Sequence, residues 1–304
     1  MDIWRSGFVR APLAEVVAAQ SLEPFTVQWL PTPSRRFAFL ADPFGMTRDG
    51  LTHIFVEAFD YRDRRGRIEV LIYDAEMALM DRATCLAEPW HLSYPITIDA
   101  DGEVYLLPEA HRSGGLTLYR AVEFPRRWEA VLRLDLPHVP IDATSLYHDG
   151  QWWLFYSAAG DRASRLHVAV ADVLSGPWRP HPASPIALGA HGSRPGGRAV
   201  HVADNILLPV QDCSRTYGGA VRPLWIYHLG PEQIEYELGA PIVAPPAFKP
   251  FAEGLHTLSA CGPITLFDVK RIDRSLAGQA TGLVGKVQRA ANRSLRPTVG
   301  TGPR

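Results

Sequence analysis

Short runs of apolar and aromatic residues make up most of the chain, and turn-forming residues separate them. Four of these runs directly follow an Asp-Gly or Asp-Asn pair, and they occupy residues 51–57, 103–109, 151–157 and 206–212. Such pairs favour tight hairpin turns, because Asp, Asn and Gly adopt a positive φ at low cost. The runs are rich in aromatic and β-branched residues, which are typical of strands. The pattern therefore predicts an all-β protein built from hairpins.

The hairpin turns recur at a nearly constant interval. The intervals are 52, 48 and 55 residues, measured between Asp49, Asp101, Asp149 and Asp204. Further strand-like runs follow the hairpins, at residues 67–73, 116–121, 166–171 and 223–228. A weaker fifth copy covers residues 254–268. A unit of about 50 residues with about four strands is what one blade of a propeller needs.

We therefore expect a five-bladed β-propeller over residues 1–272. The N-terminal segment, through residues 4–10 or residues 25–30, would complete the last blade and close the ring. The alternative is an all-β sandwich in which the regular spacing of the turns is accidental.

The segment from residue 273 to residue 304 has a different composition. From Ser275 onward it has no acidic residue and five basic ones, which are Lys286, Arg289, Arg293, Arg296 and Arg304. Apolar residues between Leu276 and Leu295 recur at helical spacing. We expect a short, basic, amphipathic helix with a flexible end. It would dock on an anionic membrane surface or a partner protein, or else pack on its own domain.

Composition narrows the class of protein. Of the 304 residues, 46% are hydrophobic and 21% are charged, as in an ordinary folded domain. The 31 Lys and Arg residues balance 32 Asp and Glu residues, so no overall basic field favours a nucleic acid partner. The cysteines (Cys85, Cys213 and Cys261) form no CxxC pair, which argues against a disulfide framework or structural zinc. No apolar run has the roughly 18 residues of a membrane span, and residues 1–5 begin no signal core, so we expect a cytoplasmic protein.

The repeat puts polar residues of different blades at equivalent positions. Seven residues after the turn stand Glu57, Glu109, Ser157 and Asp212, and eight residues before it stand Asp42, Tyr94 and Asp142. Arg194 takes the corresponding position in the fourth repeat, after a short insertion. Equivalent positions in a propeller project toward one axis, so we expect these residues to meet at one mouth of the central channel.

Carboxyl groups that meet at one mouth suit glycoside hydrolysis. That reaction uses two of them, about 5–10 Å apart, one with a raised pKa so that it can donate a proton. Asp42 and Asp142 have apolar neighbours at strand starts, where a charge is costly unless it is paired or faces water. We interpret both as catalytic candidates. The alternative is that they cap turns or pair with arginines between blades.

Several segments resemble known propeller families. The segments Ala41–Phe44 (ADPF), Ile141–Thr144 (IDAT) and Ser175–Trp178 (SGPW) resemble blade motifs of family 43 and related five-bladed glycoside hydrolases. A closer resemblance is to the N-terminal domain of plant glucosamine inositolphosphorylceramide transferase and its free-standing bacterial relatives. It rests on residues 90–95 (WHLSYP), 107–110 (LPEA), 152–155 (WWLF) and 211–218 (QDCSRTYG), and it covers residues 30–272.

The resemblance to the hydrolases implies specific roles. Asp42 would be the general base, and Asp142 would tune the pKa of the acid and orient it. The hydrolases carry the acidic Glu early in the fourth blade, where this chain has residues 193–198 (SRPGGR) and no carboxylate. The substitute donors are Glu57, Glu109 and Asp212, of which Glu109 is preferred because Pro108 marks a defined strand end.

The resemblance to the plant transferase implies a different class. There the transfer chemistry is thought to belong to a separate C-terminal domain, and the propeller has no clear activity of its own. The leading hypothesis is a glycoside hydrolase-like propeller that acts on a glycan or glycoconjugate. Its rival is a non-catalytic sugar- or glycolipid-binding module in polysaccharide or glycolipid biosynthesis, and a third alternative is a scaffold for proteins.

The remaining polar residues assigned to this mouth are candidates for substrate binding. They are Glu57, His91, Tyr94, Arg194, Arg198, Arg215, Tyr217 and His256. Arginines there would hold an anionic group such as a phosphate or uronate, or would neutralise the aspartates. The histidines lack the tight spacing of a metal site, and no phosphate loop, dinucleotide fingerprint or nucleophile elbow occurs. We therefore expect neither a metal ion nor a cofactor, and a structural role for Cys213.

Overall fold

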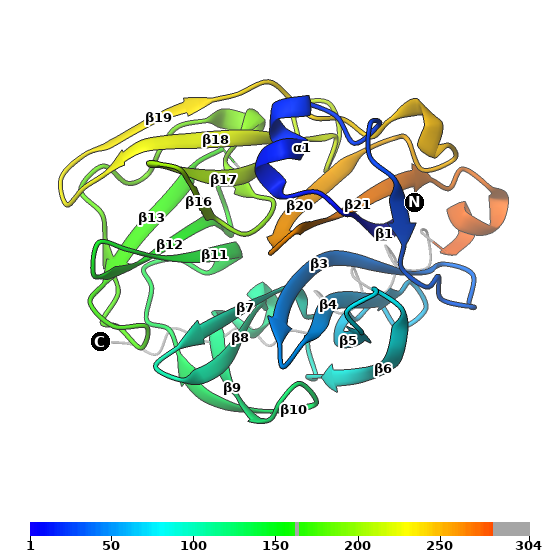
Figure 1. The fold of residues 1–304 in the computed structure, drawn as a ribbon, viewed down its shortest axis with the longest axis horizontal. Coiled ribbons are helices and arrows are strands. Elements are labelled where there is room, and N and C mark those ends of the chain that lie inside the picture. Colours follow the sequence, from blue (N-terminus) through cyan, green and yellow to red (C-terminus); the bar gives the residue numbers. More distant parts are fainter. Residues whose placement is uncertain (162–163, 282–304) are drawn as a thin grey trace, which may run out of the picture.

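Five antiparallel sheets surround a common axis in the computed structural model, which describes residues 1–161 and 164–281 (Figure 1). Each sheet is one blade, and in the first four blades the strands run in chain order from the axis outward. The all-β fold and the five-bladed propeller that the turns predict are both confirmed. A sandwich would instead have stacked two sheets face to face.

The first three blades each have four strands. Blade 1 contains β3 (Ala38–Arg48), β4 (Leu51–Asp60), β5 (Arg67–Tyr73) and β6 (Leu79–Leu86). Blade 2 contains β7 (Ser93–Ala100), β8 (Glu103–Glu109), β9 (Thr117–Glu123) and β10 (Arg127–Arg133). Blade 3 contains β11 (Pro140–His148), β12 (Gln151–Ala158), β13 (Leu166–Ala171) and β14 (Arg179–Pro180). A 3-10 turn, η1 (His111–Ser113), follows β8.

Blade 4 has an interrupted inner strand. Its parts are β15 (Arg194–Pro195) and β16 (Val200–Val202), and both pair with β17 (Asn205–Asp212). The blade continues through β18 (Ala220–Leu229) and β19 (Ile234–Leu238). The 3-10 turn η2 (Gly189–His191) precedes it, and η3 (Pro246–Phe248) leads to blade 5.

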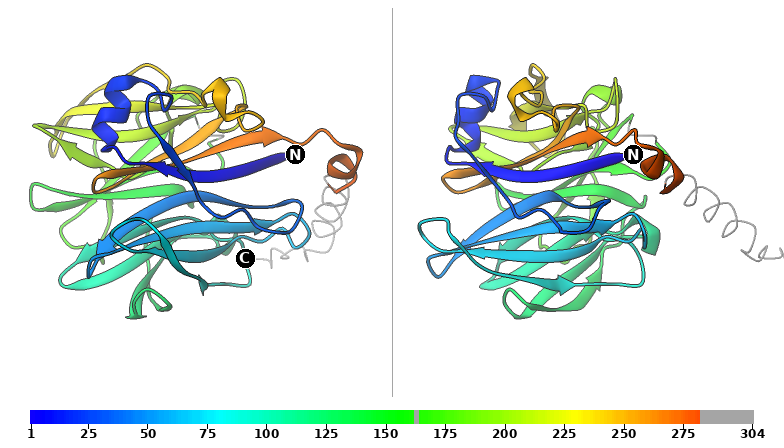
Figure 2. Two further views of the ribbon diagram at one scale, coloured as in Figure 1. Left: turned by 45° about the vertical axis from the view of Figure 1, so that its right-hand side comes forward. Right: turned by 90° about the vertical axis from the view of Figure 1, so that its right-hand side faces the viewer.

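The two ends of the propeller chain build blade 5 together. Its inner strands are β20 (Leu255–Cys261) and β21 (Ile264–Ile272), and its outer strands are β1 (Asp2–Val9) and β2 (Val27–Trp29). Strand β1 pairs with β21 over its whole length, and helix α1 (Leu13–Ala19) connects it to β2. Figures 1 and 2 show the N-terminus beside the end of β21. Both N-terminal segments expected to close the ring therefore do so.

The repeated turns produce a repeated irregularity in the inner strands. In the first three blades the register shifts once, between Ala41 and Phe44, Ser93 and Ile96, or Ile141 and Thr144. At each bulge one residue has a left-handed backbone, and these residues are Asp42, Tyr94 and Asp142, with φ of 49°, 48° and 51°. A bulge re-aims the side chain that it carries. Three of the residues that the repeat identified therefore lie at β-bulges of the inner strands, near the axis.

Apolar side chains fill the space between neighbouring blades. Phe44 of blade 1 and Tyr94 of blade 2 are both fully buried, with ring centroids 4.6 Å apart. Clusters of this kind bury the faces of each sheet, which is the main stabilising contribution in such a fold. The blades therefore form a firm support for polar groups near the axis.

A short helical segment follows the propeller. Residues 276–281 are helical, and the Ser275 hydroxyl accepts a hydrogen bond from the Gly278 amide at 3.1 Å. The basic residues predicted for the tail, from Lys286 to Arg304, lie outside the described residues, so docking through them stays a prediction, as does a domain boundary at residue 272. Within the described part of the chain, no helix is long and apolar enough to cross a membrane.

Candidate active site

A pocket of about 270 Å³ opens at one mouth of the central channel. Aromatic side chains in its lining are Trp4, Phe39, Phe59, Tyr61 and Tyr217. Its titratable residues include Asp42, Glu57, His91, Glu109, His111, Arg194 and His256. The volume is near the lower end of the roughly 300–1,000 Å³ of small-molecule sites, which suits a ligand no larger than about one ring.

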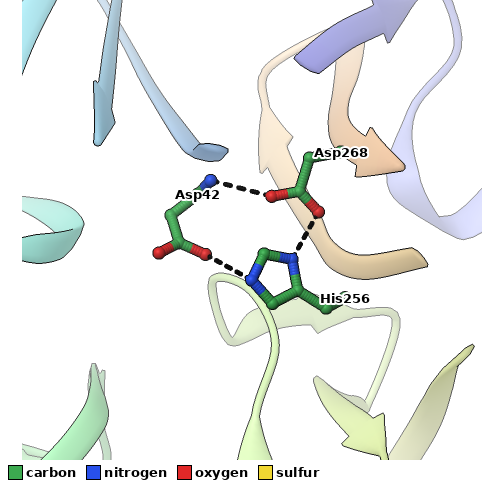
Figure 3. A group of neighbouring side chains, drawn as sticks. All are labelled: Asp42, His256 and Asp268. Carbon is green, nitrogen blue, oxygen red and sulfur yellow. Dashed lines mark hydrogen bonds and ion pairs between the residues drawn. The ribbon is translucent and has the colours of Figure 1, made fainter. Parts of the chain in front are cut away.

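At its base three buried side chains connect blade 1 with blade 5 (Figure 3). Oδ1 of Asp42 lies 3.2 Å from Nε2 of His256, and Nδ1 of His256 lies 2.6 Å from Oδ1 of Asp268. The backbone amide of Asp42 donates to Oδ2 of Asp268 at 2.8 Å. The three residues therefore form a closed ring of contacts, with the imidazole between two carboxyl groups.

The surroundings of His256 hold its ring in one orientation. Trp4 stacks on the imidazole, with centroids 3.8 Å apart and planes inclined by 18°. Asp268 accepts a third hydrogen bond, from the Thr257 amide at 3.0 Å. Because Asp268 accepts from Nδ1, the Nε2 atom is the one that faces Asp42. His256 is thus positioned to hold a proton next to the Asp42 carboxyl group.

Burial and neighbouring charges bring Asp42 into the neutral range. Burial raises the pKa of Asp42 to about 7, against the opposing effect of His256. Burial also disfavours a charged imidazole, but the carboxyl groups of Asp268 and Asp42 outweigh it and raise the pKa of His256. A carboxyl group that titrates near neutral pH is suited to general acid–base chemistry.

These three residues also stand close enough together to suggest a metal ion. The two carboxyl groups approach opposite nitrogens of the imidazole, and Asp268 already accepts hydrogen bonds from His256, Thr257 and the Asp42 amide. At most Asp42 and one nitrogen of His256 remain for a cation. That is fewer than the three protein ligands of a catalytic zinc site, so the geometry favours a hydrogen-bonded relay.

Glu57 is a second carboxyl group with an unusual environment. It stands near the end of β4, opposite Ala41, and is buried. Burial, together with the nearby Asp42 and Glu109, raises the pKa of Glu57 well above its ordinary value. Within the described residues no hydrogen bond reaches its carboxyl group, and Nε2 of His91 lies 3.6 Å from its Oε1. The surroundings of Glu57 therefore favour its protonated form, and the residue lines the pocket.

His91 next to it is neutral. Burial lowers the pKa of His91 to about 4. Its Nδ1 accepts a hydrogen bond from the Gly66 amide at 2.8 Å, so the ring proton is on Nε2, toward Glu57. His91 consequently has its N–H directed toward Glu57 and carries no positive charge that would favour the ionised carboxylate.

Glu109 lines the same pocket, but its pKa is shifted in the opposite direction to that of Glu57. Its burial opposes ionisation, but hydrogen bonds from His111 lower the pKa of Glu109. Oε1 accepts from the His111 amide at 2.8 Å and lies 2.6 Å from His111 Nδ1, while Oε2 accepts from Ser93 at 3.0 Å. An ionised, well-bound carboxylate is a poor proton donor. The electrostatics favour Glu57 over Glu109 in that role, the reverse of the order expected from Pro108.

Asp142 does not line the pocket, but it forms an ion pair with Arg194, which does. Arg194 Nε donates to Asp142 Oδ2 at 2.5 Å, and Gln211 donates to the same oxygen at 2.9 Å. Burial raises the pKa of Asp142, against the effect of Arg194. The guanidinium also lies 5.1 Å from the ring centroid of Tyr217. Asp142 therefore positions Arg194 at the start of blade 4, where the resemblance to the hydrolases implies an acid.

Two of the expected site residues lie in another pocket. Asp212 and Arg215 line it, and Asp212 is bound by Arg222 at 2.7 Å and by Ser214. Although its burial opposes this, hydrogen bonds from Ser214 and Arg222 lower the pKa of Asp212 to about 2. A carboxylate held ionised in this way is unsuited to donating a proton to a ligand in the central pocket.

Tyr94 and Arg198 point into the interior of the channel instead. The Tyr94 hydroxyl accepts from the Gly197 amide at 2.8 Å and contacts Thr144 at 2.8 Å. Arg198 donates to the carbonyl and the hydroxyl of Thr97, at 2.7 and 2.8 Å. Both hold opposite blades together, and neither lines the pocket that we describe.

Three residues of this site were not expected from the sequence. Asp268 ends the weak fifth repeat one position short of the register that identified Glu57 and Glu109. Trp4 lies in the closing segment, and His111 stands two residues after Glu109 in the turn that follows β8. The count took Cys261 and Gly262 as the fifth turn, whereas the turn lies at Gly262 and Pro263, with Cys261 paired to Ile264.

Solved structures of glycoside hydrolases share the fold of this chain. The family 117 glycoside hydrolase of the marine bacterium Zobellia galactanivorans matches with a TM-score of 0.56 and 15% identity, over 79% of this chain and 88% of that chain. RS223-Beta-xylosidase matches with a TM-score of 0.54 and 15% identity, over 69% and 79%. A thermostable family-43 glycoside hydrolase has a TM-score of 0.53 and 14% identity, over 73% and 84%. At these identities the likeness concerns the fold.

Sequence comparison connects the chain to plant proteins. Glucosamine inositolphosphorylceramide transferase 1 of Arabidopsis thaliana is 30% identical over 239 residues, which are 76% of this chain and 30% of the plant protein. Its namesake in Oryza sativa subsp. indica is 34% identical over 204 residues, 64% of this chain and 27% of the relative. The chain thus spans about 30% of the length of these relatives. The family model for glucosamine inositolphosphorylceramide transferase 1, N-terminal, matches residues 17–243, and the chain belongs to that family.

Proposed function

We propose that the central pocket binds one sugar unit of a glycan or glycoconjugate and cleaves its glycosidic bond by acid–base chemistry. The observation that carries the proposal is Asp42, a buried carboxyl group with a pKa of about 7 at the base of a ring-sized pocket. Glu57, whose pKa is raised by burial in the same pocket, supplies the second carboxyl group that the reaction needs.

The proposed roles follow from the protonation states. Ionised Asp42 takes a proton from a water molecule, whose oxygen forms a bond to the anomeric carbon. Glu57 gives its proton to the leaving oxygen as the glycosidic bond breaks. His256, held by Asp268, stabilises the ionised form of Asp42 before each turnover. The exposed ring of Tyr217 offers an apolar face on which a sugar ring packs.

Glucosamine-containing glycoconjugates are the first ligands to try. The printed names of the plant relatives contain glucosamine. The lining of the pocket also contains Glu109, a carboxylate that its hydrogen bonds keep ionised. A carboxylate in the lining is a suitable partner for the ammonium group of an amino sugar.

The second candidate function is a sugar- or glycolipid-binding module without turnover. The observation that favours it is Arg194, which is fastened to Asp142 in the fourth-blade position where a hydrolase acid would stand. The same pocket would then bind the sugar and leave its linkage intact.

A glycan array followed by product analysis separates the two. The wild-type protein is applied to the array, and each bound glycan is then incubated with wild type, Asp42→Asn and Asp99→Asn. Asp99 is an exposed carboxylate of blade 2, so it is a matched control for the change of charge. We expect product from wild type and Asp99→Asn, and a loss of about a hundredfold or more in Asp42→Asn.

Binding without product in all three proteins would support the module instead. Equal product from wild type and Asp42→Asn would contradict the assigned chemistry. No binding to any glycan would contradict both sugar-based functions and would favour a scaffold.

A further inference from the structure

A second pocket, also of about 270 Å³, lies between blade 5 and blade 1. It is lined by the first half of β1, by the connection from Leu30 to Ala38, and by parts of the chain near Phe251 and Arg271. Four of its lining residues are arginines, namely Arg5, Arg35, Arg36 and Arg271, and the described lining contains no Asp or Glu. The pocket is thus basic in a protein whose overall charge is close to zero.

Arg5 is a cation without an anionic partner in the described part of the chain. Its guanidinium lies 4.2 Å from the ring centroid of Trp29 and 5.8 Å from that of Phe251. Its Nε atom is buried and has no hydrogen-bond acceptor among the described residues. Burial lowers the pKa of Arg5. A buried donor without an acceptor costs free energy, and an anion beside the half-buried guanidinium would offset that cost by pairing with its uncompensated charge.

The other three arginines are only weakly neutralised. Arg271 lies 3.5 Å from Asp273, and Asp273 already accepts hydrogen bonds from the Ser275 amide and hydroxyl. Arg36 donates to the Ser275 hydroxyl at 3.1 Å, which brings it no negative charge. Arg35 is exposed, and no ion pair involving its side chain occurs among the described residues. Most of the positive charge of the pocket is therefore available to a ligand.

We propose that this pocket binds a phosphate monoester, with the arginines around its oxygens. Guanidinium groups match the oxygens of a phosphate through forked hydrogen bonds. A phosphate monoester carries close to two negative charges at neutral pH, so it compensates several arginines, whereas one carboxylate leaves most of them unbalanced. Pro31, Pro33 and Phe37 add an apolar wall that fits the organic part of the ester.

This site replaces the anion site expected from the sequence. Of the arginines considered there, Arg194 is bound to Asp142, Arg198 to Thr97, and Arg215 lies in another pocket. The proposal does not depend on Asp42 or on any turnover, although Trp4 lines both pockets.

Calorimetric titration with glycerol 3-phosphate tests the proposal, with inorganic phosphate as a second probe and glycerol as the neutral control. The variants are Arg5→Gln and the double change Arg35→Gln with Arg36→Gln. The second pair is exposed, so it preserves the test if the half-buried Arg5 is needed for folding. Arg127→Gln removes an exposed arginine on β10 and is the matched control. Asp42→Asn separates this site from the central pocket.

We expect the phosphate ester to bind wild type, Arg127→Gln and Asp42→Asn alike. Each guanidinium removed from the pocket should weaken binding about tenfold, because hydrogen bonds to charged groups contribute about that much. Absence of binding to wild type, or equal weakening by Arg127→Gln, would overturn the proposal. Loss in Asp42→Asn would overturn the separation of the two sites.

The phosphate has two possible sources, which vesicles distinguish. Wild-type protein is sedimented with phosphatidylcholine vesicles that contain phosphatidic acid, with or without glycerol 3-phosphate as competitor. Sedimentation that the soluble ester competes away would assign the site to a lipid headgroup. Soluble binding without sedimentation would assign it to a free metabolite, and both results support the site.

Discussion

Asp42 and His256 stand 214 residues apart in the chain, yet their Oδ1 and Nε2 atoms are 3.2 Å apart. The contact exists because the N-terminal strands complete the last blade and bring blade 1 next to blade 5. The bulge at Asp42 then turns its side chain toward the imidazole, at a backbone cost of about 1–3 kcal/mol. The acid–base properties of Asp42 thus depend on closure of the ring, because closure brings His256 next to its carboxyl group.

Replacing His256 with Gln should shift the pH dependence of turnover. His256 lowers the pKa of Asp42, so its removal raises that pKa, and ionised Asp42 forms only at higher pH. The rise of kcat/KM with pH, centred near pH 7 in wild type, should move to higher pH in His256→Gln. His228→Gln, an exposed histidine of β18, should leave the profile unchanged. An unmoved profile in His256→Gln would show that the relay does not set the basicity of Asp42.

Glu57→Gln should make the protein more stable at neutral pH. The pKa of Glu57 is raised in the folded state, so above its ordinary value of 4.5 the native state binds more protons than the unfolded chain. Stability from this residue is therefore present at low pH and declines as pH rises. Thermal melts between pH 5 and pH 8 should show a smaller decline for the Gln variant. A variant that melts below wild type at pH 8 would contradict a raised pKa.

Arg194→Met should destabilise the propeller strongly. It leaves the buried carboxyl group of Asp142 without its charged partner, which typically costs about 3–5 kcal/mol. Adding Asp142→Asn to this variant should restore part of the loss, since no unpaired charge then remains. Denaturant unfolding of both variants measures the difference. If the free energy of unfolding of Arg194→Met lay within about 1 kcal/mol of the wild-type value, the ion pair would contribute little to stability.

Tyr94→Phe tests the position of Tyr94 inside the channel. The change removes the hydroxyl that contacts Thr144 and accepts from the Gly197 amide, so the free energy of unfolding should fall by about 1–3 kcal/mol. Glycan binding should be unchanged, because Tyr94 does not line the pocket. Weaker glycan binding with unchanged stability would show that Tyr94 contacts the ligand, as the sequence analysis expected.

The fold could be read from the sequence because every hairpin carries its own local signal. Asp49 and Gly50, for example, both have a positive φ at the turn between β3 and β4, as their residue types predict. Register counting from these turns also identified Asp42, Tyr94 and Asp142, which all stand at bulges. Local chemistry and repetition were sufficient for these features.

The partners of the polar residues could not be read in the same way. Whether Arg194 reaches a ligand or Asp142 depends on the distance between blades 3 and 4, which no local pattern encodes. Asp268 escaped the count because the hairpin of blade 5 turns at Gly262 and Pro263 and lacks the Asp-Gly pair that marks the turns of the first three blades. The arginines of the second pocket come partly from the connection between β2 and β3, which lies outside the repeat.

The most direct test of the central claim is a crystal structure of Asp42→Asn with the best glycan from the array. We predict one sugar ring in the central pocket, against Tyr217, with its glycosidic oxygen within hydrogen-bonding distance of Glu57. A glycan bound elsewhere on the propeller, with only solvent in the central pocket, would contradict the account.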